Sequence, residues 1–181
     1  MNRFRSIRLN EGFTLMELMI AIAILAILTT AAVPSVQNIL RSNQVSGQTN
    51  DIVSMLNFAR NTAIRRSGDI NVVFSSSGSE WSGIVEDPDG GGSEECTASN
   101  ALRCTTNQGV SLEAAKNFTF DKRGYLKDAT FLTNDDAIAI ETMWLEHESC
   151  SNAQHRSRIE IRPTGQITSC NVECGTEGLQ C

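Results

Sequence analysis

The chain has 181 residues, and its 21 acidic and 15 basic side chains give a formal net charge of −6. An acidic balance argues against a generic nucleic-acid binder, whose surface is basic. The length fits one modest globular domain on a long helix, and no internal repeat indicates an array.

A short basic leader precedes a long apolar run at the N-terminus. Arg3, Arg5 and Arg8 lie in the leader, and the run from Phe13 to Val33 contains a single charged residue, Glu17. As a helix this run spans about 30 Å, the hydrocarbon thickness of a bilayer. Because positive residues stay on the cytoplasmic side, the sequence predicts a single-pass segment with its N-terminus in the cytoplasm.

Glu17 is the unusual residue of the apolar run. A charge near the centre of a membrane helix costs about 2.5–3.5 kcal/mol, so such a residue indicates a function. The alternative is an ordinary secretory signal peptide cut near Thr30-Ala31-Ala32, with a mature chain that begins at Val33. A disposable segment has no reason to carry this carboxylate, and the helical pattern continues beyond Pro34.

Residues 34–67 read as an amphipathic continuation of the helix. Its apolar stripe has helical spacing and consists of Val45, Ile52, Leu56, Ala59 and Ala63, broadened by Met55 and Ile64. Pro34 predicts a kink, because proline removes a backbone donor and clashes with the preceding turn. Ser67-Gly68 ends the helix after Arg65 and Arg66, whose charges suit its negative C-terminal end.

Beyond Gly68 the pattern changes to short β-segments separated by turn residues. The expected strands are Ile70–Phe74, Trp81–Glu86, Val110–Leu112, Asn117–Phe120, Ile138–Leu145, Arg158–Arg162 and Gln166–Ser169. Ser75–Ser79 is the expected hairpin loop between the first two strands. Pro163-Thr164-Gly165 is the expected turn between the last two.

Six cysteines lie in the exported part, an even count that favours three disulfides in an oxidising compartment. They are Cys96, Cys104, Cys150, Cys170, Cys174 and Cys181. The sequence permits fifteen pairings, and proximity favours Cys96–Cys104, Cys150–Cys170 and Cys174–Cys181. A zinc site built from Cys170, Cys174 and His155 is the alternative, although no paired CxxC spacing supports it.

The segment Asp87–Glu95 is acidic and glycine-rich and offers oxygen ligands for calcium. Its spacing does not match an EF-hand loop, so an acidic loop without a cofactor is the simpler interpretation. The two histidines, His147 and His155, belong to no nucleophile, Walker or metalloprotease motif. We therefore expect a protein that is not an enzyme.

The residues around the leader resemble a known family. Gly12-Phe13-Thr14-Leu15-Met16-Glu17 is similar to the class III signal of type IV pilins and type II secretion pseudopilins. The resemblance implies cleavage by a prepilin peptidase between Gly12 and Phe13, N-methylation of Phe13, and an assembly role for Glu17. Pro34 also matches the family pattern. The new Phe13 amine then lies in an apolar environment, where Glu17 of a neighbouring subunit neutralises both charges.

The implied fold is α+β and type IV pilin-like, a long N-terminal α-helix packed against a C-terminal antiparallel β-rich head. Residues 1–12 are the removed leader, 13–33 the transmembrane and filament-core helix, 34–67 its continuation, and 68–181 the periplasmic or extracellular head. The implied partners are the prepilin peptidase, other pilins or pseudopilins in a hetero-oligomeric filament, an inner-membrane assembly platform, and the lipid bilayer before assembly.

Downstream residues narrow the resemblance to the GspH/FimT group. Ala59–Arg66 followed by Ile70–Phe74 is similar to its helix end and first strand, and Trp81–Asp87 to its Trp-x-x-Gly strand and acidic loop. The Arg158–Cys170 hairpin is similar to its terminal strands. The resemblance implies a minor pilin that helps initiate or cap type IV pilus assembly. The alternative is a minor pseudopilin of the type II secretion system.

Some pilus members of this group bind DNA through a Gly-Arg-x-Arg element in the last hairpin. Here the position reads Gly165-Gln166-Ile167-Thr168, and the absence of both arginines argues against DNA binding. Arg156, Arg158 and Arg162 still offer a basic strip for phosphate contacts. Glu160 lies among them, however, and such alternating charges predict a solvated strand face.

Overall fold

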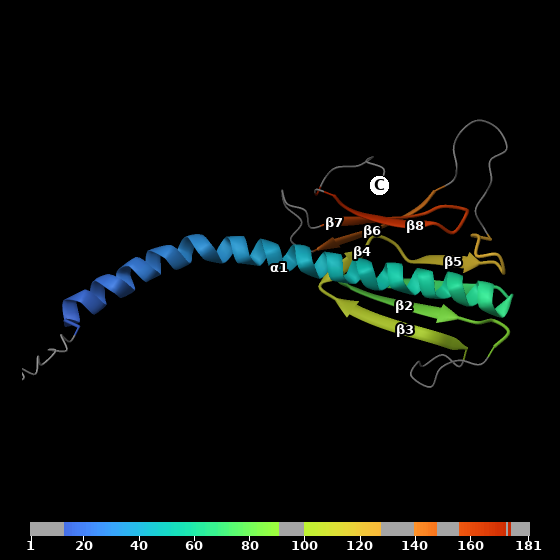
Figure 1. The fold of residues 1–181 in the computed structure, drawn as a ribbon, viewed down its shortest axis with the longest axis horizontal. Coiled ribbons are helices and arrows are strands. Elements are labelled where there is room, and N and C mark those ends of the chain that lie inside the picture. Colours follow the sequence, from blue (N-terminus) through green and yellow to red (C-terminus); the bar gives the residue numbers. More distant parts are fainter. Residues whose placement is uncertain (1–12, 91–99, 128–139, 148–155, 173, 175–181) are drawn as a thin grey trace, which may run out of the picture. The chain divides into compact units, whose positions relative to one another are not determined.

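The computed structural model describes residues 13–90, 100–127, 140–147, 156–172 and 174. The chain divides into two compact units, one ending at Ile39 and the other comprising Leu40–Cys181. Helix α1 (Leu15–Arg66) precedes eight strands within these residues, and the strands form two antiparallel sheets (Figure 1). The fold is therefore α+β, with an N-terminal helix followed by antiparallel sheets, as the sequence predicts.

The second part of α1 buries the expected apolar stripe. Val45, Ile52, Leu56, Ala59 and Ala63 are each no more than 1% exposed, which confirms the stripe. Met55 is fully buried with them. Ile64 is 44% exposed, so its assignment to the stripe is wrong.

The end of α1 has the geometry of a Schellman cap. Ser67 adopts a positive φ of 54°, and the Gly68 N–H donates to the Ala63 carbonyl at 3.3 Å. This hydrogen bond satisfies one of the carbonyls that a helix end leaves without a partner. The helix therefore stops at Arg66, where the sequence places its end, but the left-handed residue is the serine and not the glycine.

The first sheet has the strand order β3-β2-β1-β5. Its strands are β1 (Ile70–Ser77), β2 (Glu80–Glu86), β3 (Ala101–Gln108) and β5 (Lys116–Phe120). Ser77 pairs with Glu80, so the β1–β2 loop has two residues and not the five that the sequence predicted. Gly78 opens this loop with a φ of 62°, the pattern of a type II′ hairpin turn, which allows the serines to continue the strand.

The second sheet has the strand order β4-β6-β7-β8. Its strands are β4 (Val110–Leu112), β6 (Glu141–His147), β7 (Arg156–Ile161) and β8 (Ile167–Val172). β6 ends at His147 and not at Leu145 as expected, and β7 begins at Arg156 and not at Arg158. β3 was not predicted at all, because its alternate residues are polar threonines and amides at the edge of the first sheet, where little apolar surface is buried.

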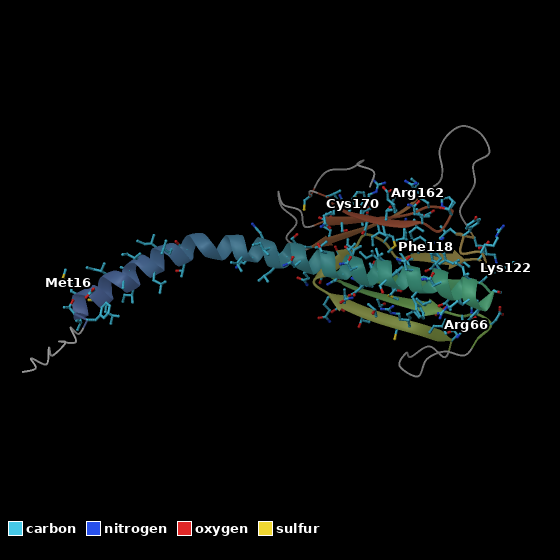
Figure 2. The ribbon with its side chains drawn as sticks, viewed as in Figure 1. Met16, Arg66, Phe118, Lys122, Arg162 and Cys170 are labelled. Atoms are coloured by element: carbon cyan, nitrogen blue, oxygen red, sulfur yellow. The ribbon has the colours of Figure 1, made fainter. Side chains whose placement is uncertain are left out.

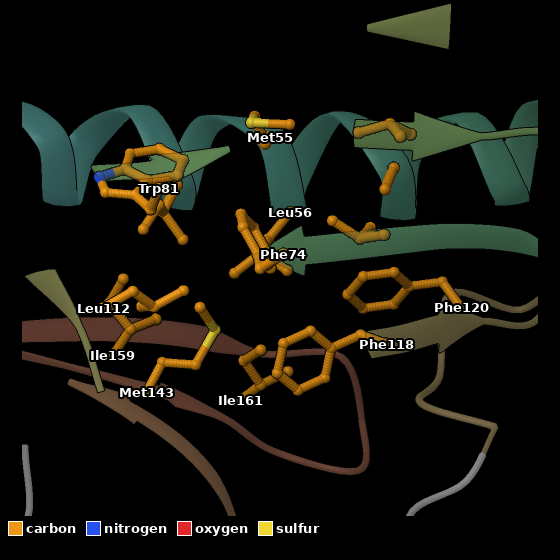
Figure 3. Packing of buried hydrophobic residues seen from close by; sticks show 14 of the residues in the cluster. Met55, Leu56, Phe74, Trp81, Leu112, Phe118, Phe120, Met143, Ile159 and Ile161 are labelled. Carbon is orange, nitrogen blue, oxygen red and sulfur yellow. The ribbon is translucent and has the colours of Figure 1, made fainter. Parts of the chain in front are cut away.

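The core lies between the second part of α1 and the two sheets (Figure 3). Phe74 is at its centre, with its ring centroid 6.1 Å from that of Trp81 and 6.3 Å from that of Phe118. Both ring pairs are tilted, as aromatic quadrupoles favour. Met143 and Ile159 bring the second sheet into the same cluster.

Two polar or small residues fix how α1 lies on the first sheet. Gln48, 7% exposed, accepts from the Trp81 indole N–H at 2.7 Å and donates to the Gln108 carbonyl at 2.9 Å. A Cβ at Gly83 would lie 2.8 Å from the Phe74 ring and 2.9 Å from the Met55 methyl group. Gly83 therefore makes room for the Met55 side chain of the helix to reach the sheet.

Candidate functional site

The start of α1 is built by a threonine cap. The Thr14 hydroxyl oxygen accepts from the Glu17 backbone N–H at 3.2 Å, and the Thr14 carbonyl accepts from the Leu18 N–H at 3.2 Å. A capping hydroxyl of this kind satisfies a donor that the first helical turn leaves free. Glu17 is therefore the third residue of the helix, with its carboxylate exposed beside the positive end of the helix dipole.

The first part of α1, which ends at residue 40, and Phe13 just before it expose apolar side chains on all sides. Each of the following is more than half exposed: Phe13, Leu15, Met16, Leu18, Met19, Ile20, Ile22, Ile24, Leu25, Ile27, Leu28, Val36, Ile39 and Leu40. A helix that is apolar all round is stable only when other groups cover it. Figure 2 shows these side chains projecting from the helix, with Met16 labelled.

Within the residues that the structure describes, no helix has the length and apolar character needed to cross a membrane. Gly12 of the predicted cleavage site lies outside those residues. α1 continues without interruption through position 34, so the kink at Pro34 stays a prediction.

Arg156 and Arg158 of β7 lie against Trp144 of β6. Their guanidinium carbons are 4.1 and 5.2 Å from the centre of the indole ring. Arg156 Nε is 3.5 Å from a carboxylate oxygen of Glu146, and Arg158 Nε is 3.1 Å from Glu160 Oε1. Each arginine side chain is only 11% exposed. Both guanidinium groups are therefore covered by the Trp144 ring and paired with carboxylates, and both are poorly placed to contact phosphate.

The solvated face predicted for this strand is wrong. Glu160 is 1% exposed, and its neighbours Ile159 and Ile161 are fully buried. Both sides of β7 are therefore covered. The ion pair between Glu160 and Arg158 makes this burial possible, because a buried carboxylate needs a charged or hydrogen-bonding partner. Arg162, which follows the strand, is exposed.

The cysteines that the structure describes are Cys104, Cys170 and Cys174, and all three are disulfide-bonded. Cys96, Cys150 and Cys181 lie outside the described residues, so the three predicted pairings stay predictions. The zinc alternative is wrong for Cys170 and Cys174, because zinc binds the thiolate form of cysteine and not a disulfide sulfur.

Asp87, the first carboxylate of the predicted calcium-binding loop, already has partners within the protein. Asp87, 7% exposed, forms an ion pair with Arg66 and accepts from the Asp89 N–H at 3.1 Å. Residues 91–95 lie outside the described part, so calcium binding by Asp87–Glu95 stays a prediction. Among the described residues no three His, Cys, Asp or Glu side chains gather as a metal site. His147 ends β6, and His155 is not described.

A second group of basic residues includes Arg162, which the sequence singled out, and Lys122, Arg123 and Lys127, which were missed in the sequence. It lies on two turns that we call the paired turns, residues 121–127 after β5 and residues 162–166 between β7 and β8. Arg60 of α1 holds them together, since its Nε donates to the Gly124 carbonyl at 3.1 Å and its Nη2 to the Thr164 carbonyl at 3.4 Å. The sequence predicted the turn at Pro163-Thr164-Gly165 and named Arg162, but nothing in it indicates that this turn meets residues 121–127.

Asp121 organises the first of these turns. Its Oδ1 accepts from the backbone N–H groups of Arg123 and Tyr125 at 2.8 and 2.9 Å, and its Oδ2 accepts from Arg123 Nε at 2.9 Å. Burial alone would raise the pKa of this carboxyl. The hydrogen bonds from Tyr125 and Arg123, with the Arg123 charge, outweigh burial and hold the pKa below its ordinary value.

Two family profiles match the chain. The profile of the prokaryotic N-terminal methylation motif matches residues 7–33, and that of the type II transport protein GspH matches residues 48–165. A methylation motif at the start of a long helix that precedes a β-rich head defines the class of pilin-like subunits. The GspH profile spans more than half of the chain, which therefore belongs to the GspH family, the GspH/FimT group of minor pilins and pseudopilins.

Two crystal structures of the type IV minor pilin FimU from Pseudomonas aeruginosa PAO1 also match. The one in space group P65 has a TM-score of 0.48 at 15% identity, over 68% of this chain and 90% of that chain. The one in space group P21 has a TM-score of 0.48 at 16% identity, over 70% and 87%. No curated protein matches the chain significantly.

Proposed function

We propose that the protein is a non-enzymatic minor pilin, a low-abundance subunit that helps to initiate or cap a type IV pilus. A prepilin peptidase cuts between Gly12 and Phe13, and Phe13 is N-methylated. The subunit is anchored in the inner membrane until the assembly platform passes it to other pilins. The methylation-motif match at residues 7–33 and the GspH match at residues 48–165 support this proposal.

The observation that carries the proposal is the exposed apolar first part of α1 with the Glu17 carboxylate at its start. Neighbouring apolar helices cover such a surface in a filament core. The same packing removes water from Glu17, which then needs a cation. The amine of Phe13 in an adjacent subunit is that cation, and the pair forms only when the subunits stand in the correct register.

Substitution of Glu17 tests its proposed role in filament assembly. We expect Glu17→Ala to leave membrane insertion intact and to lower recovery with sheared filaments at least about tenfold, because an unpaired buried charge costs about 3–5 kcal/mol. Glu80→Ala removes an exposed carboxylate of β2 and is the matched control. Normal recovery of Glu17→Ala in the filament fraction would refute the role.

The processing step is tested separately by intact-mass analysis of the protein from cells. The expected mass is that of a chain beginning at Phe13 and carrying one methyl group. A chain beginning near Val33 would instead identify an ordinary signal peptide and overturn the proposal.

The alternative function is a minor pseudopilin of the type II secretion system, since the family includes both kinds of subunit. Deletion of the gene distinguishes them. Loss of pili or twitching with secretion intact supports the minor pilin, and loss of secretion with normal pili supports the pseudopilin.

A further inference from the structure

A pocket of about 340 Å³ lies between the last turns of α1 and strand β3. We call it the arginine pocket, and its lining residues are Phe58, Thr62, Arg65, Arg66 and Leu102. Phe58, Thr62 and Arg65 follow one another at steps of four and three residues, so they lie on one face of the helix. Phe58 and Leu102 are half-buried against the core and give the pocket an apolar wall. Figure 2 labels Arg66 at this end of α1.

A β-bulge turns Leu102 toward the pocket. The register of β2 against β3 shifts between Val85 and Glu86, and Leu102 is the residue of β3 that has no opposite partner there. Strict alternation would place Leu102 and Arg103 on opposite faces of the sheet. Instead Leu102 packs against the core, and the Arg103 guanidinium lies 5.7 Å from the ring centroid of Phe58. The bulge therefore brings both side chains to the helix side of the sheet.

Two arginines at this place are available to an anion. Arg65 Nη2 donates to Thr62 Oγ1 at 3.2 Å. Arg103 Nη1 donates to Ser54 Oγ at 3.3 Å. Both acceptors are neutral, and neither arginine forms an ion pair with any side chain that the structure describes, whereas Arg66 is already paired. Because a guanidinium has five N–H donors, Arg65 and Arg103 each keep several for a carboxylate.

Strand β3 also offers its backbone to a ligand. It is an edge strand of the first sheet, and β2 is its one neighbour among the strands described (Figure 1). Edge strands are usually protected from further pairing by lysine or proline. Residues 105–108 are uncharged and include neither. A further strand could therefore pair with β3 beside the arginine pocket.

The side chains of such a strand would meet a defined series of groups. Alternate residues of a strand point to the same face, about 6.6–6.8 Å apart. On the helix side they would meet Arg65, then the apolar pair Phe58 and Leu102, and then Arg103. Charge complementarity requires an acidic residue, an apolar residue and a second acidic residue at alternate positions. A lipid anion would use the arginines and the apolar wall but not the backbone edge.

We propose that the arginine pocket and the edge of β3 bind an extended acidic segment of another protein by strand addition. The backbone of the segment pairs with β3, its two carboxylates accept from Arg65 and Arg103, and its apolar side chain packs on Phe58 and Leu102. The main-chain bonds supply affinity, and the side chains supply specificity. This activity goes beyond the proposed function, and it uses neither Glu17 nor the first part of α1.

The experiment is an anisotropy titration of the full chain, in a non-ionic detergent, with a short fluorescein-labelled peptide. In this peptide Glu, Leu and Glu alternate with threonines. We expect saturable binding that weakens as salt rises. Replacement of both glutamates of the peptide by glutamine should lower affinity at least about tenfold, and this change cannot act through misfolding of the protein. Arg65→Glu should also lower it at least about tenfold, and Leu102→Ser at least about threefold.

Hydrogen exchange followed by mass spectrometry tests the strand addition itself. The bound peptide should slow amide exchange in Ala101–Gln108, because new backbone hydrogen bonds protect these groups. Strand β8 is an edge of the second sheet and is the internal control, since its exchange should not change. Equal slowing in both strands, or none in β3, would overturn the proposal.

Arg41→Glu is the matched control for Arg65→Glu, because it makes the same change in net charge about 36 Å along α1. It should leave affinity within about twofold. Equal losses in the two variants would overturn the proposal, since net charge alone would explain them. So would the absence of saturable binding to the acidic peptide, or binding only to phosphatidylglycerol vesicles.

Discussion

Among the glycines that the structure describes, Gly165 is the one at which replacement by alanine should be most damaging. Gly165 has a φ of 77°, so a side chain there is strained by about 1–2 kcal/mol. The new Cβ would also lie 1.9 Å from the Gly124 carbonyl oxygen, which is backbone and cannot turn aside. The paired turns must therefore separate.

The cost of that separation follows from the hydrogen bonds that cross it. The bond from the Leu126 N–H to the Pro163 carbonyl contributes about 1 kcal/mol. Arg60 donates to the Gly124 carbonyl of one turn and the Thr164 carbonyl of the other, and loss of one of these two charged bonds costs about 1.5–3 kcal/mol. With the backbone strain, we expect a loss of about 4 kcal/mol, a large fraction of the usual 5–15 kcal/mol.

Replacement of two other glycines distinguishes the cost of backbone strain from the cost of separating the paired turns. Gly78 has a φ of 62° but nothing within 4 Å of a Cβ, so Gly78→Ala should cost only the strain, about 1 kcal/mol. Gly47 lies within α1 with nothing within 4 Å, so Gly47→Ala should stabilise by about 0.5–1 kcal/mol.

The assay is urea unfolding of the full chain in detergent, followed by tryptophan fluorescence, to which the buried Trp81, 2% exposed in the folded protein, contributes together with Trp144. The unfolding midpoints should fall in the order Gly47→Ala, wild type, Gly78→Ala, Gly165→Ala. If Gly165→Ala and Gly78→Ala have the same midpoint, the two turns are not in contact and the reasoning fails.

Two further predictions concern single residues. Asp121→Ala should destabilise by about 1–2 kcal/mol at pH 7, and the difference from wild type should shrink as pH falls below about 4. The sign follows because the pKa of Asp121 is lowered in the folded protein. The stabilisation by its carboxylate is therefore present above the ordinary pKa and is lost on acidification. A constant difference between variant and wild type in urea titrations from pH 7 to pH 3 would contradict this prediction. Ser67→Gly should raise stability by about 0.5–1 kcal/mol, because glycine adopts the positive φ without strain, and an unchanged melting temperature would argue against that geometry.

The sequence predicted the parts of the fold that follow from local pattern. The apolar stripe from Val45 to Ala63 repeats at helical spacing, and burial of one helix face requires that spacing whatever the partner is. Strand β3 shows the limit, since Thr105, Thr106 and Asn107 have no apolar alternation and pair with β2 only because Trp81–Val85 offers them a strand edge.

The charged residues were harder to interpret for a related reason. Arg158 and Glu160 alternate with isoleucines, a pattern typical of a strand with one wet face. Their mutual ion pair allows Glu160 to be buried, and the Trp144 ring, which comes from another strand, covers most of Arg158. The paired turns could not be predicted either, because Arg60, Gly124 and Thr164 are distant in sequence and meet only in the folded chain.

The Gln48 bridge has a mechanical consequence for a filament subunit. A pull along α1 loads the hydrogen bonds from Trp81 to Gln48 and from Gln48 to the Gln108 carbonyl in shear. The bond from Trp81 is buried and the bond to the Gln108 carbonyl is partly buried, so solvent has little access to them as they stretch. Slippage of the helix by one turn, about 5.4 Å, would break both at once. Tension on the helix is thus passed through the Gln48 amide into the first sheet, and these two bonds add to the load that the head withstands before it slides along its helix.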